Sequence, residues 1–335
     1  LYTASINPQL DESEFRSNTK ELTTLFSPLT IGSMEISNRM VKSAAGSATY
    51  LAGLTDELLT YYVNLAKGGV ALIYVETIAA LEVPEGGSYD ADTLAFGQKL
   101  VDECHKYGAK MGYQMSGFGM GENDMTIDDI HAKQAHFVEV AKGLQQMGFD
   151  CVELNCAGFN MPAHFLSRFH NTRTDEYGGS FENRMRFPLR LVKAVREAVG
   201  ENMAIDFRIS QNEYVEGGTT LEDVITFLKA AEPYIDDANL SGGWIFDPVY
   251  VKYMMPGYPQ ELCLNIPRTA IVHEQLDIPV TCVGNIPNIE TAEQILAEGK
   301  ADIVAFARNI LADMDLVNKA YRGEEDTIRP CLRCI

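Results

Sequence analysis

The sequence predicts a single α/β domain folded as a (β/α)8 TIM barrel. Short apolar segments alternate with longer amphipathic ones in one series of eight strands and eight helices, which indicates a parallel sheet. A doubly wound open sheet would need an early Gly-x-Gly-x-x-Gly turn, but Ala44-Ala45-Gly46-Ser47 follows the first strand. No long linker or repeat divides the chain, so a closed barrel is favoured.

The strands are assigned from short apolar runs, each bounded by turn residues. In chain order they are predicted at Met40–Ala45, Val70–Thr77, Lys110–Ser116, Cys151–Asn155, Met203–Ser210, Asp237–Ser241, Pro279–Asn285 and Asp302–Arg308.

The helices are assigned to the longer stretches between the strands. Within 181–199 the apolar residues recur every three or four positions, Ser180 is the expected N-cap, and Pro188 is expected to kink the helix. The helices are predicted at Asp56–Lys67, Thr93–Tyr107, Asp128–Met147, Phe181–Val199, Leu221–Ala231, Ile266–Gln275, Thr291–Glu298 and Leu311–Tyr321. Residues 1–24 form an N-terminal surface arm, 25–325 the barrel, and 326–335 a short separate segment.

Composition excludes several classes of protein. The chain has 47 acidic and 27 basic residues, a net charge of −20, which argues against nucleic acid and anionic membranes as partners. No apolar run approaches the roughly 20 residues of a membrane span, so we expect a soluble, cytoplasmic protein. Because Leu rather than Met is first, export after signal cleavage stays open, as does a homo-oligomer.

The strand ends carry the candidate binding residues, since barrel active sites lie at the carboxyl ends of the strands. Gly284, Asn285, Ala307 and Arg308 end the last two strands. Glycine admits backbone N–H groups close to a phosphate, and an arginine adds a charge-assisted contact. Together they predict a phosphate site.

Gln114 and Arg208 end the third and fifth predicted strands. A reduced flavin carries negative charge near N1 and the C2 carbonyl, so a cation and an amide donor placed there would favour the reduced state. Polar residues are common at strand ends, however, and these two alone leave the question open.

The loop 171–184 reads Asn-Thr-Arg-Thr-Asp-Glu-Tyr-Gly-Gly-Ser-Phe-Glu-Asn-Arg. It resembles the signature after the fourth strand in the Old Yellow Enzyme family, flavin-dependent ene-reductases on a (β/α)8 barrel. The resemblance extends from about Leu25 to the C-terminus and implies bound FMN. It places Gln114 and Arg208 against the isoalloxazine, and Ala44, Ala45 and Thr77 at the ring edge.

The last residues resemble a particular branch of that family. Cys331 and Cys334 form a Cys-x-x-Cys pair, similar to the start of the cluster motif in 2,4-dienoyl-CoA reductase and trimethylamine dehydrogenase. There four cysteines hold a [4Fe–4S] cluster that feeds electrons to FMN. The resemblance implies half of such a motif, and either NAD(P)H or a redox partner as the electron donor.

The fourth strand departs from the family pattern. Its usual string supplies a substrate-binding His or Asn and a catalytic Tyr, whereas this chain has Asn155, Gly158 and Asn160. Asn155 can still donate to a substrate carbonyl. Asn160 stands in the Tyr position, and an amide is a far poorer proton donor than a phenol. Ile245 stands where the branch places a His.

Replacement proton donors are few. Tyr50 follows the first strand, and His164 lies after the fourth. Tyr250 and Tyr253, with Tyr258, lie in a long aromatic insert at 244–267, a candidate substrate lid. Its aromatic content suits a flat apolar substrate such as an aryl acrylate, a polycyclic enone or a steroid.

Four functions fit the sequence to different degrees. The first is an FMN-dependent reductase of an activated C=C bond in a small molecule, in which hydride goes to the β-carbon and a proton to the α-carbon. The others are a flavin-dependent amine dehydrogenase or demethylase, a non-catalytic flavin electron-transfer subunit, and a barrel lyase or isomerase of a phosphorylated substrate. The last leaves Gln114 and Arg208 unexplained.

Overall fold

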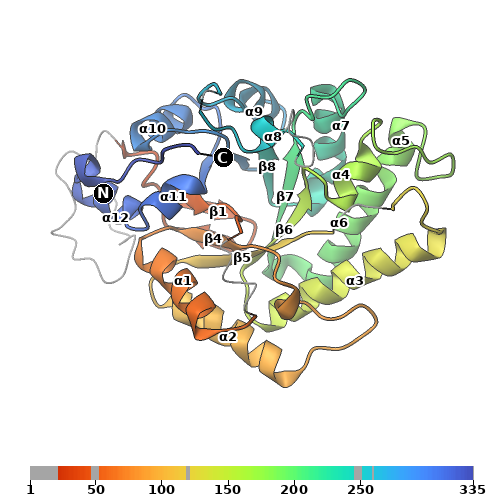
Figure 1. The fold of residues 1–335 in the computed structure, drawn as a ribbon, viewed down its shortest axis with the longest axis horizontal. Coiled ribbons are helices and arrows are strands. Elements are labelled where there is room, and N and C mark those ends of the chain that lie inside the picture. The colour runs from red at the N-terminus through yellow and green to blue at the C-terminus, as the bar shows by residue number, and fades with distance from the viewer. Residues whose placement is uncertain (1–21, 47–52, 118–120, 245–250, 259, 335) are drawn as a thin grey trace.

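The computed structural model describes residues 22–46, 53–117, 121–244, 251–258 and 260–334. Eight parallel strands close into a barrel in the order β10-β3-β4-β5-β6-β7-β8-β9, with helices around it (Figure 1). The barrel strands are β3 (Met40–Lys42), β4 (Leu72–Val75), β5 (Lys110–Met115), β6 (Cys151–Cys156), β7 (Ala204–Ser210), β8 (Asp237–Ser241), β9 (Val280–Cys282) and β10 (Ile303–Phe306). The predicted (β/α)8 fold is confirmed, and each of these strands lies within one residue of, or inside, its predicted range.

The helices begin at strong sequence caps. Thr126 and Thr220 each form a capping box with an aspartate three residues later. The helices are α1 (Asp56–Lys67), α2 (Ala91–His105), α3 (Ile127–Gln146), α4 (Met161–Leu166), α5 (Phe181–Arg184), α6 (Arg186–Val199), α7 (Leu221–Ala231), α8 (Val251–Met254), α9 (Ile266–His273), α10 (Ile289–Ala297), α11 (Arg308–Ala312) and α12 (Leu316–Arg322).

Two predicted helices are broken in the structure. The helix predicted at 181–199 divides into α5 and α6 at Met185. Pro188 explains the break, because a proline has no N–H to donate to the carbonyl four residues earlier, that of Arg184, and its ring crowds such a carbonyl in a regular helix. The helix predicted at 311–321 divides into α11 and α12. Asp313 is extended there, and its carboxylate accepts from Lys319 Nζ at 2.6 Å and Arg329 N at 2.9 Å.

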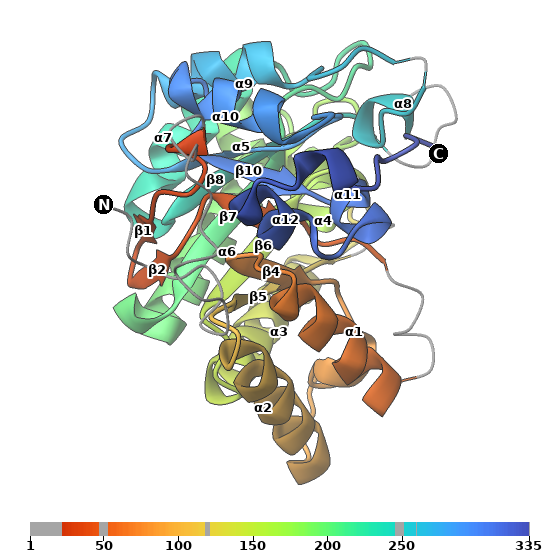
Figure 2. The same cartoon turned by 90° about the vertical axis from the view of Figure 1, so that its left-hand side faces the viewer.

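An antiparallel hairpin absent from the prediction precedes the barrel, formed by β1 (Leu29–Ile31) and β2 (Met34–Ile36) (Figure 2). Its buried residues Ile31, Met34 and Ile36 pack into one cluster with barrel residues such as Val41 and Ile303. Three-residue strands are too short for periodicity to reveal. The hairpin therefore covers apolar residues of the barrel. The candidate site is formed by other residues, which lie at the carboxyl ends of the barrel strands.

The loop that carried the family resemblance is a structural clamp. Asn171 Nδ2 donates to Phe165 O and Tyr177 O at 2.7 Å each. Arg173 Nη1 donates to Met125 O at 2.8 Å, and Arg184 Nε donates to Leu166 O at 3.0 Å. These bonds tie α4 to the start of α3 and to α5. The charged side chains of this loop therefore fix the backbone beside the fourth-strand end.

We expect Gly178→Ala to destabilise the protein by about 1–3 kcal/mol, the usual cost of overpacking. A Cβ at Gly178 would overlap the backbone carbonyl of Arg173, which cannot move without breaking the clamp. Chemical denaturation measures the change in the free energy of unfolding. Glu176→Ala, an exposed change in the same loop, serves as the control and should stay within about 0.5 kcal/mol of the parent. Equal stabilities for the two variants would contradict the clamp.

Candidate active site

The adjacent strands β5, β6 and β7 bring Gln114, Glu153 and Arg208 together. Glu153 is fully buried, and Gln114 Nε2 donates to its Oε1. Arg208 Nη1 lies 3.9 Å from Glu153 Oε2 and donates to Ser43 Oγ at 2.9 Å, while Nη2 donates to Ser241 Oγ at 3.3 Å. The two residues predicted for the flavin ring thus converge on one carboxylate.

Sequence reasoning missed Glu153, Ser43 and Ser241. The signal for Glu153 was present, because a charged residue in the middle of an apolar strand must find partners once buried. The two serines carried no comparable signal, since hydroxyls at strand ends have many uses. The structure shows that they fix the guanidinium of Arg208 from β3 and β8.

Ala44, Ala45 and Thr77 lie at the neighbouring strand ends. Ala44 and Ala45 are half-buried and follow β3 directly. Thr77 Oγ1 donates to Gln114 O at 2.7 Å, which links the end of β4 to β5. Small side chains at this edge are compatible with the predicted contact to a planar group, which stays a prediction.

Asn155 is the next-to-last residue of β6. Its Nδ2 donates to Ser116 Oγ at 3.3 Å, and its Oδ1 accepts from Ala157 N at 3.0 Å. An amide nitrogen carries two hydrogens, so one is left for a ligand. Asn160 is the N-cap residue of α4, and its Nδ2 donates to Ala157 O at 2.7 Å. The residue in the family's Tyr position therefore shapes the loop.

His164 is buried and bonded through Nδ1 to Glu122 Oε1 at 3.0 Å, while its Nε2 has no partner among the described residues. Its ring stacks on His170 with centroids 4.3 Å apart, and His170 packs on Trp244 at 4.7 Å. Burial, reinforced by His164, lowers the pKa of His170 to about 4. His170 is therefore neutral at neutral pH.

The tyrosines considered as proton donors or as part of the lid divide into three groups. Tyr50 and Tyr250 lie outside the described residues. Tyr253 belongs to α8, where its ring stacks on Tyr214 with centroids 3.9 Å apart and planes inclined by 8°. Tyr258 is 75% exposed.

Helix α8 rests on the strand ends. Met254 lies where side chains at Gly158 and Gly243 would project. Both glycines have positive φ angles, so the loops after β6 and β8 accept α8 at close range. Helix α8 therefore packs over the loop after β6.

The predicted phosphate residues follow β9 and β10, just beyond the last residue of each strand. Gly284 and Asn285 have φ angles of 130° and 56°. A Cβ at Gly284 would lie 2.5 Å from Asn265 Nδ2. Asn309 Nδ2 donates to Pro287 O at 3.1 Å, which joins the two loops.

Arg308 follows Ala307, the N-cap residue of α11. It donates to Pro256 O at 2.6 Å and to Cys334 O at 3.1 Å. No described carboxylate forms an ion pair with it. The guanidinium thus holds two neutral carbonyls, one of the insert and one of the C-terminal tail. Figure 2 shows the C-terminal tail beside α8.

Cys331 and Cys334 lie in that tail, half-buried and exposed respectively. Arg333 N donates to Cys331 Sγ at 3.4 Å, and Arg333 has a φ angle of 55°. This tight turn directs a backbone N–H at the first sulfur, as cluster-binding loops do. Across the described residues no group of three or more His, Cys, Asp or Glu is arranged to hold a metal ion.

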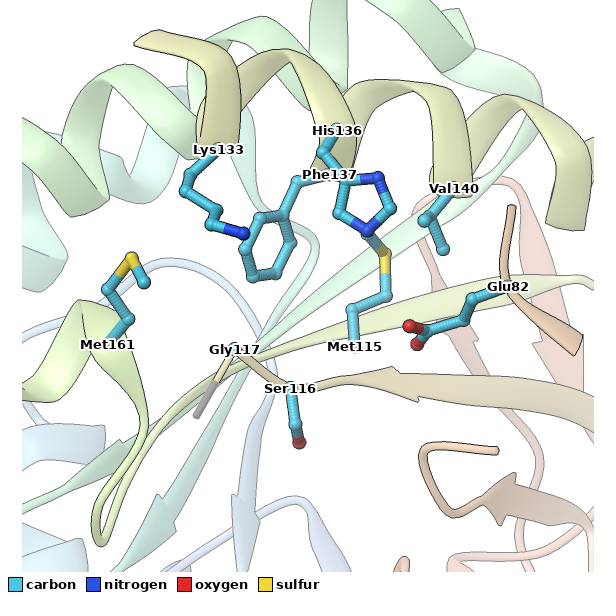
Figure 3. A pocket seen from close by; sticks show the side chains of 9 residues that line it. All are labelled: Glu82, Met115, Ser116, Gly117, Lys133, His136, Phe137, Val140 and Met161. Atoms are coloured by element: carbon cyan, nitrogen blue, oxygen red, sulfur yellow. The ribbon is translucent and has the colours of Figure 1, made fainter. Parts of the chain in front are cut away.

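A cavity of about 280 Å³ lies beside the mouth, between α3 and the end of β5 (Figure 3). Met115, Phe137 and Met161 give it an apolar wall, with Lys133 and Glu82 at its edges. Burial raises the pKa of Glu82 to about 7, against the effect of its bond from Tyr113. The cavity is on the helix side of β5, so Ser116 separates it from Asn155.

Comparison with known proteins assigns the family. The model of the NADH:flavin oxidoreductase / NADH oxidase family matches residues 24–123 and 119–327. The chain belongs to this family. The Old Yellow Enzyme-like resemblance is thereby confirmed. No described helix has the length and apolarity to cross a membrane.

Several relatives extend well beyond this chain. An NADH oxidase of Thermoanaerobacter brockii is 33% identical over 345 residues, covering 92% of this chain and 52% of its own length. A cinnamate reductase of Clostridium sporogenes is 27% identical over 364 residues, covering 92% and 54%. A solved 2-naphthoyl-CoA reductase complex shares the fold, with a TM-score of 0.83, 24% identity, and coverage of 93% and 54%. The chain spans about half the length of these proteins.

Proposed function

We propose that this chain is the FMN-binding barrel of a reductase that acts on the activated C=C bond of an aryl or polycyclic enoate or enone. The convergence of Gln114 and Arg208 at the barrel mouth carries the proposal. Family membership and the similarity to a cinnamate reductase support it. When bound, reduced FMN supplies the hydride.

The residues present fit FMN on two observations. Among the described residues Arg308 donates to two neutral carbonyls and to no carboxylate, so its charge is available to a phosphate, and the positive φ angles of Gly284 and Asn285 turn the adjoining loop sharply. At the other end, Arg208 and Gln114 would face the ring, beside Ala44, Ala45 and Thr77. Asn155 would bind the substrate carbonyl through its second amide hydrogen.

The proton donor is proposed among Tyr50, His164, Tyr250 and Tyr253. His164 has an unpartnered Nε2 and is fixed by Glu122. Tyr253 is fixed by Tyr214 within the lid. To identify the donor, each tyrosine is replaced by Phe and His164 by Gln, one at a time. Only the replacement of the true donor should slow substrate reduction, and if no replacement does so, the proton comes from solvent.

We further propose that Cys331 and Cys334 are two ligands of a [4Fe–4S] cluster whose other ligands lie outside the printed sequence. The N–H donated to Cys331 supports this assignment. A nicotinamide nucleotide or a redox partner would then supply electrons. Iron and acid-labile sulfide per flavin, measured in protein purified without oxygen, test the proposal. A buried-thiol control, Cys104→Ser, should not alter them.

The decisive experiment mixes chemically reduced protein anaerobically with cinnamate, with larger aryl enoates and enones, and with the saturated analogue of each. We expect flavin oxidation by unsaturated compounds alone. If amines reduce the oxidised protein and no unsaturated acceptor oxidises the reduced one, the reaction is an amine dehydrogenation.

Arg308→Ala should weaken cofactor retention, because a bidentate contact to phosphate would be lost. Flavin content after extensive dialysis measures the effect, and Arg329→Ala, an exposed arginine of the same tail region, is the matched control. Full flavin occupancy in both variants would remove Arg308 from the phosphate site.

A further inference from the structure

A row of polar side chains crosses the interior of the barrel. Gln114, Glu153, Asp206 and Asp237 are register partners on the adjacent strands β5, β6, β7 and β8. All three acids are buried, with at most 1% of their surface exposed. Neighbouring strands lie roughly 4.8 Å apart, so each acid is next to another.

The row runs obliquely along the barrel axis. Gln114 is one residue from the end of β5, at the mouth, whereas Asp237 is the first residue of β8. One end therefore touches the candidate cofactor site, and the other lies toward the opposite opening. Glu153 lies 3.9 Å from Arg208, so a proton bound to Glu153 changes the charge beside that guanidinium.

Hydrogen bonds connect the row only in part. Asn239 Nδ2 donates to Glu153 Oε2 at 2.9 Å and to Asp206 Oδ2 at 3.2 Å, and Thr281 Oγ1 donates to Asp237 Oδ2 at 2.6 Å. Asp206 Oδ1 and Asp237 Oδ1 have no partner in the described structure. A buried carboxyl oxygen without a donor is costly as a charge and far less costly when protonated.

The charges that face the row do not balance three carboxylates. Arg208 lies 3.9 Å from Glu153. Lys42 is the other nearby cation, and burial, against the attraction of Glu76 and Glu153, lowers its pKa to about 8. The remaining titratable neighbours, all acids, phenols or thiols, are Tyr74, Cys151, Cys282 and Asp302.

Burial, reinforced by the neighbouring carboxyls, raises the pKa of Asp206 well above its ordinary value. Burial also raises the pKa of Asp237, although the bond from Thr281 opposes the shift. Both groups therefore hold protons in the folded chain at pH values where they would be ionised in water. Glu153 accepts hydrogen bonds from two amides, those of Gln114 and Asn239, and lies 3.9 Å from Arg208.

We propose that this row is a proton store beneath the cofactor site, which takes up one proton from solvent when the cofactor receives a hydride. The inference rests on the proposed function. A hydride from a nicotinamide nucleotide brings two electrons and one proton, so it adds one negative charge at the mouth. One solvent proton then goes to Glu153, the acid of the row that lies beside Arg208, and the net charge around Arg208 is preserved.

The resting state is tested without any cofactor. In the wild-type apoprotein, infrared spectroscopy should show the carbonyl stretch of protonated buried acids at neutral pH, and Asp206→Asn and Asp237→Asn should each remove part of it. Because Asp206 and Asp237 bind more protons in the folded chain than in the unfolded one, their contribution to stability should fall as pH rises above the ordinary Asp value of 3.8. Asp237→Asn should flatten that slope. No protonated-acid band in the wild type would overturn the proposal.

The uptake itself is tested on the flavin-loaded protein by counting protons taken up per two electrons. We expect Glu153→Gln to take up about one proton fewer than the wild type, which lowers the slope of potential against pH by about 29.6 mV per unit. Asp206→Asn, which replaces an acid that is already protonated, should keep the wild-type count. Asp302→Asn, at the opposite end of the barrel, is the control and should match the wild type. Equal counts in all four proteins would contradict the store. Failure to bind flavin would instead sink the proposed function and leave the apoprotein result intact.

Discussion

Asn155→Ala should reduce turnover on an enoate or enone by about 10²-fold, the loss typical of a single oxyanion donor, while flavin binding stays intact. In this account the second hydrogen of the Asn155 amide polarises the substrate carbonyl, and only Ser116 uses the first. Rapid-mixing oxidation of pre-reduced protein by cinnamate measures the step directly.

Two variants separate donation from loop structure. Asn155→Asp keeps an oxygen for the N–H of Ala157 and removes the amide donor, so it should lose activity with the loop preserved. Ser116→Ala frees the amide without removing it and should cost much less. If Asn155→Asp retains full turnover, the carbonyl is bound elsewhere.

Arg208→Met should lower the two-electron potential of the bound flavin by roughly 30–65 mV. One charge-assisted hydrogen bond is worth about 1.5–3 kcal/mol, and 30 mV corresponds to about 1.4 kcal/mol for two electrons. The structure also supports a fall in the flavin potential, because Arg208→Met leaves the Glu153 carboxyl buried without its neighbouring cation. Potentiometric titration against dyes measures the shift.

Arg208→Lys is the matched control for this effect. It keeps the charge but cannot hold Ser43 and Ser241 at once, so its potential should fall between those of the wild type and Arg208→Met. A wild-type potential in Arg208→Met would remove this residue from the flavin site.

Much of the fold could be predicted from sequence, because alternation of strands and helices is a local signal. The eight barrel strands and the family followed from it and from the loop at 171–184. The β1–β2 hairpin could not, since its strands are three residues long. The break at Met185 follows from Pro188, although it lies three residues earlier than the proline itself.

The candidate site was predictable only at the level of strand ends. Gln114 and Arg208 were expected near each other, but their common partner Glu153 depends on register across three strands. Asp206 and Asp237 become a row for the same reason. The contacts of Arg308 with Pro256 and Cys334 join segments remote in sequence, and local patterns carry no trace of them.

Identification of the cofactor tests the central claim most directly. The purified protein is heated, and the released compound is separated and quantified against its phosphate content and chain concentration. We predict one FMN per chain, held by the single phosphate site at Gly284, Asn285 and Arg308. FAD, or no flavin from correctly folded protein supplied with excess FMN, would contradict the account.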